Sequence, residues 1–415
     1  MPPQSASTSS GTPPPIRVHI LGAGPVGLIL TALLQPTERF SVHLYEKRRD
    51  YTRTRMVQLA SSLVAESVES YCTDYIDQES VQAVFDPKEI SNVLAFRESV
   101  PSDLKTLLRG WTQGFCPLNA IERSLSDLID ARQSHPVQRT TAVVTAEDAV
   151  AMLEPGDILI DCTGARSVLR DQLVPGADAA SGASGANTYT IRLEYALVIT
   201  FLYGQAYECN ESCKYYKNIE NAHYKFIPAV NRTFYDGSVS HVTGIVNISA
   251  EDYERMPSQF DGQWLRDNFA HVAESMDRFI AKIKQETNGE IVGDLEIIRI
   301  PLQLYHARNA TSREWRRTRT GDHPFTRSPA FLVGDSAMGS PYFQSISLGF
   351  ECAMFLAALL AERDLDLGDV LDRYELYAYK QWLRVYMRSK MIKHNKDLLE
   401  SVGDDDALLE KLHIY

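Results

Sequence analysis

The chain has little cysteine and no excess of basic residues, and both shortages exclude classes of protein. Its 415 residues include only 6 cysteines, whereas a disulfide-stapled secreted domain is short and dense in cysteine. Its formal net charge is −12, and a nucleic-acid-binding surface needs clustered Lys and Arg. We therefore expect reduced thiols, a cytoplasmic location and no nucleic-acid partner.

Metal ligands in a recognisable spacing are also missing. Cys209 and Cys213 form the one close cysteine pair, and no second pair or nearby His completes a tetrahedral site. We expect no metal, and a metal or disulfide role for this pair is the alternative.

The sequence lacks long apolar runs and a leader. Met354–Leu360 is among the longest apolar runs, well short of the roughly 20 residues that span a bilayer. Residues 1–15 are rich in Pro, Ser and Thr and predict a disordered tail. The basic stretch Tyr374–Lys396 is interpreted as a helix packed on the protein, with a membrane-associating helix as the alternative. We expect no stable membrane insertion.

A dinucleotide-binding fingerprint occupies residues 16–46. Its apolar strand runs into Gly22, which lets the backbone turn tightly towards a helix. Gly24 has no side chain that would keep the pyrophosphate away, and Gly27 lets the helix pack closely on the strand. The helix N-terminus directs free N–H groups at the phosphates. Glu46 follows about 20 residues later, where a carboxylate accepts hydrogen bonds from ribose hydroxyls.

The order of the other segments predicts an α/β chain with two joined domains. The sequence predicts helices at Val26–Leu34, Ser61–Tyr71, Ile121–Ala131 and Gln263–Glu286, and strands at residues 16–21, 40–45, 157–161 and 295–305. Small residues at 176–187 mark a domain boundary. The stretch Tyr189–Ser249, rich in Tyr, Thr, Val and Ile and with Asp236-Gly237 as a turn, predicts an antiparallel sheet.

The first domain is expected to be interrupted by the second. Residues 16–187 and 306–385 form a nucleotide domain, residues 188–305 a substrate domain, and residues 386–415 a C-terminal helical segment, after a tail at 1–15. The chain returns to nucleotide-domain character at Ala330–Asp335. Ligands bind preferentially at such junctions, so the reactive centre is expected there.

Two further motifs lie outside the fingerprint. One is Arg55-Met-Val-Gln-Leu-Ala60, and the other is Leu332-Val-Gly-Asp-Ser-Ala337 followed by the segment Pro341–Glu351. Together with the fingerprint they resemble the FAD-dependent aromatic hydroxylases, the class A flavoprotein monooxygenases, and are nearest in pattern to the kynurenine 3-monooxygenase branch. The resemblance covers most of residues 16–385, and its middle third depends on layout more than on motifs.

The resemblance implies an FAD site. It implies a Rossmann-like FAD-binding domain with adenosine at the fingerprint, phosphates at Arg123, flavin and pyrophosphate near Arg55, and a ribitol hydroxyl at Asp335. Either arginine could instead be a surface residue. The implied cofactor-binding residues are Gly22, Gly24, Pro25, Val26, Gly27, Glu46, Lys47, Arg55, Gln58, Arg123, Thr163, Gly164, Gly334, Asp335, Gln344, Ser345, Ile346 and Ser347.

Three positions depart from the family pattern. Thr163 replaces the Asp of the family's Cys-Asp-Gly element, Met338 replaces a His, and the glycines around Gln344 are lost. These changes place side chains where the flavin reacts or moves. They favour, as an alternative, a redox-neutral FAD enzyme such as a cyclase or isomerase, or a non-oxygenating flavin oxidoreductase.

The activity implied by the resemblance is that of an FAD-dependent monooxygenase. Such an enzyme takes NAD(P)H as a transient reductant and O2, and hydroxylates or epoxidises an aromatic or electron-rich small molecule through a flavin C4a-hydroperoxide. No catalytic acid or base is obligatory, and the candidates are Arg55, Tyr195, Tyr224 and Gln344. A flavin halogenase would be expected to carry a Trp-x-Trp-x-Ile-Pro segment, which this sequence lacks. A non-enzymatic flavin-binding regulator is a further alternative.

Substrate contacts are expected from aromatic residues that alternate on the predicted strands of the second domain. They are Tyr195, Phe201, Tyr203, Tyr224, Phe226 and His241, which would line an apolar pocket over the flavin or fill the core. Tyr305, His306 and Arg308, just after the last strand, are open to the same two interpretations. The substrate itself and the oligomeric state are not predicted.

Overall fold

One half of the molecule, which we call the nucleotide half, is built on a five-stranded parallel sheet. The computed structural model describes residues 14–53, 56–71, 84–85, 87–173, 187–204, 226–233, 239–312, 328–340, 345–362 and 364–402. The sheet order is β11-β6-β1-β2-β5, formed by Ala330–Leu332, Ile158–Asp161, Ile16–Leu21, Phe40–Glu46 and Gln138–Thr141. All four pairings are parallel.

Helices pack on this sheet and enclose the larger hydrophobic core. These helices are α1 (Pro25–Leu34), α4 (Pro87–Glu98), α5 (Ser102–Thr112), α6 (Leu118–Ala131), α7 (Ala146–Ala151), α11 (Ser345–Ala361) and α12 (Leu367–Val402). α1 packs against both α6 and α11. The core joins residues from distant segments, such as Ile20, Leu28, Phe331, Phe350 and Tyr374, all fully buried.

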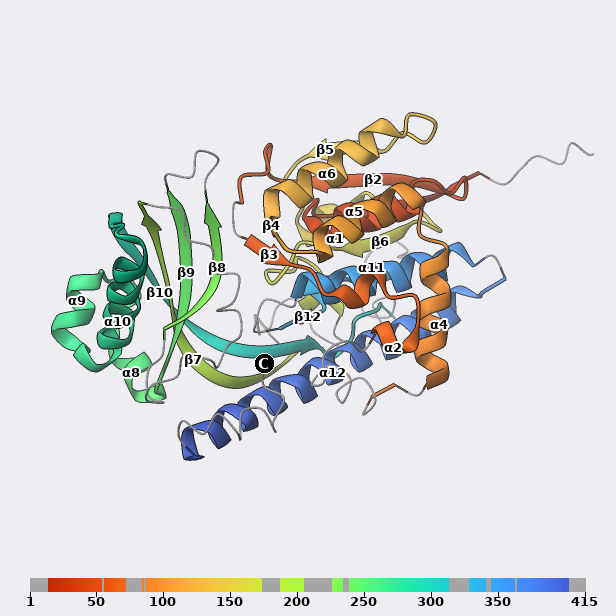
Figure 1. Cartoon of the computed structure of the whole chain (residues 1–415). Coiled ribbons are helices and arrows are strands. Elements are labelled where there is room, and N and C mark those ends of the chain that lie inside the picture. The colour runs from red at the N-terminus through yellow and green to blue at the C-terminus, as the bar shows by residue number, and fades with distance from the viewer. Residues whose placement is uncertain are drawn as a thin grey trace, which may run out of the picture.

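The other half, the sheet half, is an antiparallel sheet with helices on one face (Figure 1). Its order is β12-β10-β7-β9-β8, formed by Met338–Gly339, Ile291–Ala307, Thr188–Tyr203, Ser240–Ile248 and Phe226–Thr233. The covering helices are α8 (Ala250–Arg255), α9 (Gly262–Asn268) and α10 (Ala270–Thr287). The mixed fold, with a Rossmann-like parallel sheet, a separate antiparallel sheet and C-terminal helices, agrees with the fold class expected from the sequence.

Two long strands connect the halves. β7 and β10 pair antiparallel from Tyr203 with Ile291 to Thr188 with Ala307, with two register shifts on the way. At one end Leu197 and Ile199 pack in the smaller core under α10. At the other end Leu304 and Ala307 belong to the core of the nucleotide half. A single curved ribbon therefore runs through both halves (Figure 1).

Four short elements of the nucleotide half lie between β2 and α6 in the chain. β3 (Met56–Gln58) pairs antiparallel with β4 (Phe115–Pro117). A 3-10 turn, η1 (Ser61–Val64), and a short helix, α2 (Val68–Tyr71), follow β3. The predicted continuous helix Ser61–Tyr71 is therefore wrong, because Ala65 is extended, with a ψ of 137°, and separates the two pieces.

The predicted helix Gln263–Glu286 is also two helices. α9 ends and α10 begins at Phe269, whose φ of −138° and ψ of 55° break the helical path. The Phe269 side chain is buried in the core of the sheet half, against α10 residues such as Val272. The helix breaks where this ring is buried. The spacing of apolar residues along the sequence does not reveal such a break. The predicted helix at Ile121–Ala131 and the first β-α-β unit are confirmed.

α12 is one unbroken helix that continues past residue 385. Its buried stripe includes Tyr374, Tyr377, Gln381 and Val385, which pack on the nucleotide half. Within the described part of the chain, no helix is both long and apolar enough to span a membrane. Residues 1–13, the loop 176–186, Asp236-Gly237 and the cysteine pair at 209 and 213 lie outside the described residues.

Candidate functional site

Two glycines of the fingerprint are required by the fold itself. Gly22 has a φ of +94°, and a Cβ there would lie 2.7 Å from the carbonyl oxygen of Cys162. A Cβ on Gly27 would lie 1.9 Å from the carbonyl oxygen of Gly22. Glycine at these positions lets the turn after β1, the first turn of α1 and the end of β6 lie in contact.

Gly24 differs from both, because neither its backbone nor its packing requires glycine. Its φ is −74°, an ordinary value for any residue. The nearest atom to a Cβ on Gly24 would be Arg53 Nη2, at 3.6 Å. No side chain caps the N-terminus of α1, so its first N–H groups are available to an anion. The missing side chain leaves open space in front of these groups.

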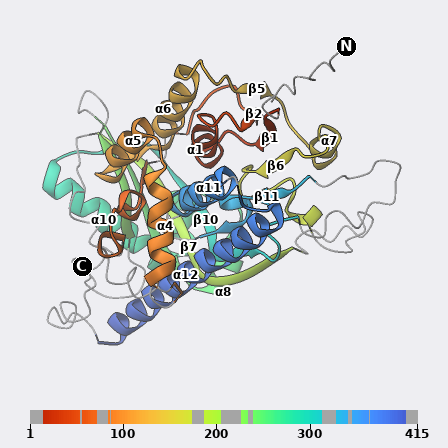
Figure 2. The same ribbon diagram turned by 90° about the vertical axis from the view of Figure 1, so that its right-hand side faces the viewer.

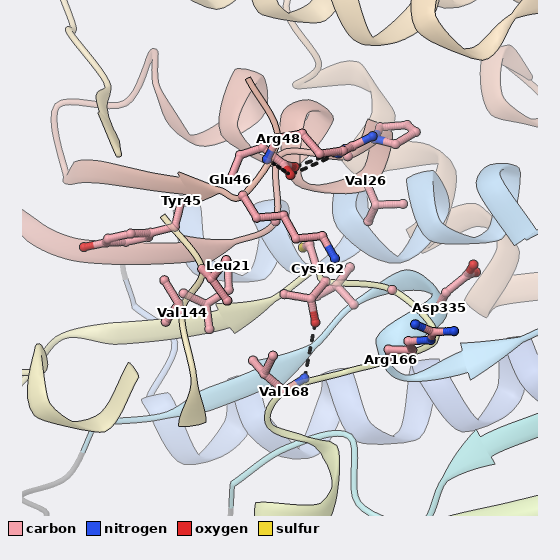
Figure 3. Close-up of a pocket in the computed structure, with 18 of the residues that line it drawn as sticks. Leu21, Val26, Tyr45, Glu46, Arg48, Val144, Cys162, Arg166, Val168 and Asp335 are labelled. Carbon is pink, nitrogen blue, oxygen red and sulfur yellow. Dashed lines mark hydrogen bonds and ion pairs between the residues drawn. The ribbon is translucent and has the colours of Figure 1, made fainter. Parts of the chain in front are cut away.

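That space belongs to a cavity of about 450 Å³. Figure 3 shows Tyr45 and Val144 at one end of the cavity and Asp335 at the other, with Glu46 between them. The cavity thus extends from the edge of the parallel sheet to the start of α11. The lining residues expected from the sequence are Gly22, Gly24, Pro25, Val26, Glu46, Lys47, Thr163, Gly164, Asp335, Ser345 and Ile346.

The Glu46 carboxylate lines the cavity, where it can accept hydrogen bonds from hydroxyl groups of a ligand. Arg48 donates to its carboxylate from the backbone N at 2.9 Å and from Nε at 3.0 Å. Burial alone would raise the pKa of Glu46, but the hydrogen bonds from Arg48 outweigh it and lower the pKa. The carboxylate is therefore ionised at neutral pH.

Of the cations around the cavity, Lys47 was expected from the sequence, and three arginines that line it were not. Lys47, Arg48, Arg53 and Arg166 line it, whereas Arg123 is exposed and donates to the Tyr51 carbonyl oxygen at 3.1 Å. Arg123 therefore lies away from the place where phosphates were expected to meet it.

Glu122, the residue before Arg123 in α6, faces the protein interior, whereas Arg123 faces solvent. Glu122 lies on the buried stripe of α6 with Ile121 and Leu125 and is fully buried. It forms ion pairs with Arg53 and Arg48. Sequence reasoning missed this carboxylate, although its position on the apolar stripe of a helix was a signal that it turns inward.

Asp335 is held from two sides. Ser336 donates hydrogen bonds to the carbonyl oxygens of Val333 and Asp161, which ties the Gly-Asp turn to the end of β6. Tyr305 donates its hydroxyl to the Asp335 carbonyl oxygen at 2.7 Å, and the Arg170 guanidinium lies 5.0 Å above the Tyr305 ring. Burial, and then the charge of Asp335, raise the pKa of Tyr305 to about 12, so it remains a donor.

Thr163 belongs to a turn organised by a different carboxylate. Asp161 is fully buried and accepts hydrogen bonds from the Thr163 backbone N–H at 2.8 Å and hydroxyl at 2.6 Å. It also accepts from the Ser167 hydroxyl and the Leu169 N–H. The Thr163 hydroxyl in turn accepts from Val168 N, drawn in Figure 3. The Thr163 hydroxyl therefore makes both of these hydrogen bonds within the turn.

Other predicted residues support the cavity without lining it. Ser347 accepts a hydrogen bond from Ala60 N at 2.9 Å and so joins α11 to the segment after β3. A Cβ on Gly334, whose φ is +70°, would lie 3.1 Å from Val26. Met338 is buried in the core. Gln58 lies in β3, opposite Phe115.

Three predicted site residues, Arg55, Tyr224 and Gln344, lie outside the described residues. Phe226 and His241 are placed only by their strands, where Phe226 pairs with Val246 and His241 with Leu202. Among the described residues, no cluster of His, Cys, Asp or Glu could hold a metal ion.

Of the two interpretations that the sequence left open for Tyr195, Phe201 and Tyr203, the structure agrees with the core. Phe201 and Tyr203 are buried in the core of the sheet half, and Tyr195 packs against that core with its ring 4.5 Å from that of Tyr253 on α8. All three point towards the helices. Alternation along a strand separates two faces but does not tell which face meets the other domain.

The opposite face of the same sheet is aliphatic and turns towards the nucleotide half. Ala196, Ile245 and Leu302 form its buried centre, with Val198 and Ile300 packed against them. Next to Leu302 on β10, Leu304 already belongs to the core of the nucleotide half.

The three residues after the predicted last strand have structural partners. Tyr305 holds Asp335, as described above. His306 packs its ring 4.3 Å from that of Trp382, and burial lowers its pKa. Arg308 donates its backbone N–H to the Asn187 carbonyl oxygen at 2.8 Å.

These features fit an adenine dinucleotide. The space at Gly24 and the N-terminus of α1 suit a pyrophosphate, because they offer N–H donors with cations nearby. The ionised Glu46 suits ribose hydroxyls. Asp335 lies at the far end of the cavity, where the remainder of an extended cofactor such as FAD would reach.

Comparison with protein-family models and with curated proteins gives no match. Solved structures match in fold. The flavin-dependent halogenase CmlS gives a TM-score of 0.52 at 14% identity, over 97% of this chain and 68% of CmlS. CtdE, solved with FAD and a substrate, gives 0.53 at 13% identity, over 94% and 92%. BexE, studied for oxidation during BE-7585A biosynthesis, gives 0.51 at 16% identity, over 96% and 73%. At these identities the chain shares the fold of these proteins.

Proposed function

We propose that this chain is an FAD-dependent monooxygenase that uses NAD(P)H and O2 to hydroxylate or epoxidise an aromatic or other electron-rich small molecule. The observation that carries the proposal is Gly24, a glycine that neither the backbone nor the packing requires, at the mouth of the helix that opens the cavity. The shared fold with solved flavoproteins supports FAD as the dinucleotide.

The residues of the chain would bind, orient and shield. Glu46 would hold the adenosine ribose, α1 and its neighbouring cations the pyrophosphate, and Asp335 the ribitol. When bound, FAD would supply the redox chemistry that activates O2 for transfer to an electron-rich atom. The aliphatic face around Val198 and Ile300 would hold the substrate and keep water from the reacting atoms.

The test is spectroscopic. Purified chain should carry FAD, and NADH or NADPH should bleach its absorbance near 450 nm, the expectation for a flavin that accepts hydride. Product formation should then consume one NAD(P)H and one O2 per substrate. Flavin that stays oxidised in the presence of both nicotinamides and of substrate contradicts the monooxygenase proposal.

One observation favours a second candidate, an FAD enzyme with redox-neutral chemistry. Position 163 carries a hydroxyl that is committed to Asp161, whereas the resembling family has a carboxylate there that touches both cofactors. A chain without this carboxylate has one contact fewer for NAD(P)H. Substrate turnover with no NAD(P)H consumed would select this second candidate.

A further inference from the structure

A second cavity, of about 520 Å³, lies in another part of the nucleotide half. It is enclosed by η1, α2, α4, α5 and α11, and Figure 2 shows α4 crossing beside α11. None of the described residues that line it also lines the dinucleotide cavity. Small-molecule sites have volumes of about 300–1,000 Å³, so this cavity has the size of a ligand site.

Its walls are mainly apolar. The apolar lining residues are Leu63, Val64, Ala65, Val68, Leu94, Ala95, Val100, Leu108 and Met354. Leu63, Leu108 and Met354 are buried, so the inner wall is made of core side chains from three separate elements. Such a lining suits the hydrocarbon part of a ligand.

One polar group in the lining is buried and charged. The Arg97 side chain is only 9% exposed, and it donates a hydrogen bond to the Ser62 carbonyl oxygen. The nearest carboxylate oxygen among the described residues, Glu351 Oε1, lies 3.9 Å from Arg97 Nη2, beyond hydrogen-bond distance. Among the described residues, Arg97 therefore donates to one neutral carbonyl oxygen, lies 4.8 Å from the centroid of the Tyr71 ring, and meets Glu351 only at ion-pair distance.

Glu351 is engaged elsewhere. It accepts hydrogen bonds from Ser62 at 3.1 Å, Tyr71 at 2.6 Å, Gln381 at 2.9 Å and Arg384 at 3.3 Å. A buried guanidinium is stabilised by a carboxylate that accepts two parallel hydrogen bonds. The cavity beside Arg97 is the place from which such a carboxylate can come.

Charged residues of both signs line the rest of the cavity, with Glu66 and Glu98 beside two further cations. Lys105 and Arg109, one turn apart on α5, both line it. Lys105 Nζ donates to the Glu98 carbonyl oxygen, and Arg109 pairs with Glu66 at 2.7 Å. Both members of that pair are exposed, at 57% and 79%, and exposed pairs contribute little stability. The pair can open to admit a ligand whose anionic group these cations attract.

We propose that this cavity binds a small organic monocarboxylate with an apolar body. The carboxylate pairs with Arg97, and the apolar body lies against Leu63, Leu108 and Met354. The site is independent of the dinucleotide cavity, and the proposal does not rest on the proposed function.

Calorimetric titration of the full chain with octanoate tests the site, with octanamide as the uncharged probe of the same length. Octanoate should bind saturably. Octanamide should bind at least about tenfold more weakly, because it is uncharged and offers one acceptor oxygen where a carboxylate forms an ion pair through two parallel hydrogen bonds. Equal affinity of the two probes, or no saturable heat with octanoate at about 10 mM, a weak-binding limit on the affinity scale, overturns the proposal.

A variant that fills the cavity separates binding there from binding elsewhere. Ala95 lines the cavity from an exposed position on α4, so Ala95→Trp should occupy the space and leave Arg97 in place. We expect octanoate binding to be lost with little change in melting temperature. The matched control is Ala281→Trp, at an exposed alanine of α10, which should bind as the wild type does. Octanoate binding that survives Ala95→Trp unchanged contradicts the assignment.

Removal of the charge gives a second, independent readout. Arg97→Met keeps an unbranched side chain but removes the guanidinium, and the folded fraction of this variant should bind octanoate and octanamide with equal affinity. A retained preference for octanoate would place the anion partner elsewhere and overturn the role of Arg97.

Discussion

The hydroxyl of Thr163 donates a 2.6 Å hydrogen bond to the carboxylate of Asp161, two residues earlier in the chain. The turn after β6 therefore has its negative charge at the buried end of the strand. The resembling hydroxylases place a carboxylate at the position of Thr163. In this chain that position serves the fold of the turn.

Restoring the family residue should destabilise the turn. Thr163→Asp would place a second carboxylate beside Asp161, and one of the two pKa values would rise. A carboxyl whose folded-state pKa is raised binds its proton more tightly when folded, so the lost stability should return as pH falls through that pKa. We expect a lower melting temperature at pH 8 and a smaller difference from wild type at pH 5. Thr163→Ser is the control and should melt close to wild type at both pH values.

Gly24 and Gly27 should behave differently when a side chain is added. Gly24→Val should fold with a melting temperature near that of the apo wild type but retain no FAD, because the side chain enters the pyrophosphate space. Gly27→Val should not fold, since a Cβ there would lie 1.9 Å from a backbone oxygen. Flavin absorbance and thermal melting measure both effects. Wild-type flavin content in Gly24→Val would refute the dinucleotide assignment.

Asp335→Ala should weaken the binding of FAD about tenfold, the effect of losing one hydrogen bond between a carboxylate and a ligand hydroxyl. Fluorescence titration of the apoprotein with FAD gives the dissociation constant. Tyr305→Phe leaves the Asp335 carboxylate in place and removes the hydroxyl that bonds the Asp335 carbonyl oxygen and Arg170, so it should have a smaller effect. A larger effect from Tyr305→Phe than from Asp335→Ala would mean that the Asp335 carboxylate makes no contact with FAD.

The network around Glu351 should dominate the stability of the nucleotide half. Glu351→Gln would remove the carboxylate that buried Arg384 contacts at 3.3 Å, at a cost of about 3–5 kcal/mol in the free energy of unfolding. Tyr71→Phe removes one hydrogen bond to the same carboxylate and should cost about 1–3 kcal/mol. Urea unfolding of both variants measures the costs, and the reverse order would contradict a role for the charge.

Acid should destabilise the protein through His19. Burial lowers the pKa of His19 below its ordinary value of 6.5, despite its contact with Asp157. Below about pH 6.5 the unfolded chain then binds more protons than the folded chain. The free energy of unfolding should therefore decrease as the pH is lowered, by up to about 1.4 kcal/mol per pH unit. Unfolding of wild type and His19→Gln at pH 5 and 8 tests this. An equal loss in both proteins would assign the acid sensitivity to other groups, such as His43 or His306, whose pKa values are also lowered.

The first β-α-β unit and its glycine turn could be predicted from the sequence because their constraints are local. Gly22 and Gly27 are required by contacts within one β-α-β unit, and such contacts depend on spacing along the chain. Arg53 and Glu122 were missed because their pairing joins the segment after β2 to α6. That approach depends on how α6 packs, which no local pattern records.

The sequence could not decide between pocket and core for the aromatic residues of β7 for a related reason. Tyr195, Phe201 and Tyr203 share one side of β7, and the sequence shows that they alternate with Ala196 and Val198. Which side meets α10 is decided by the connection from β9 through α8 and α9. The aromatic rings fill the broad space under these helices, and the smaller side chains are left for the junction.

The β7–β10 ribbon has a mechanical consequence. Its hydrogen bonds continue from the helix-covered end of the sheet into the core of the nucleotide half, so no short linker is available at these two strands about which the halves could rotate. Any relative movement must bend or twist a continuous pair of strands, and the two register shifts are its softest points. Admission of a substrate should therefore depend on the connecting segments at the rim of the junction, while the two walls keep their spacing.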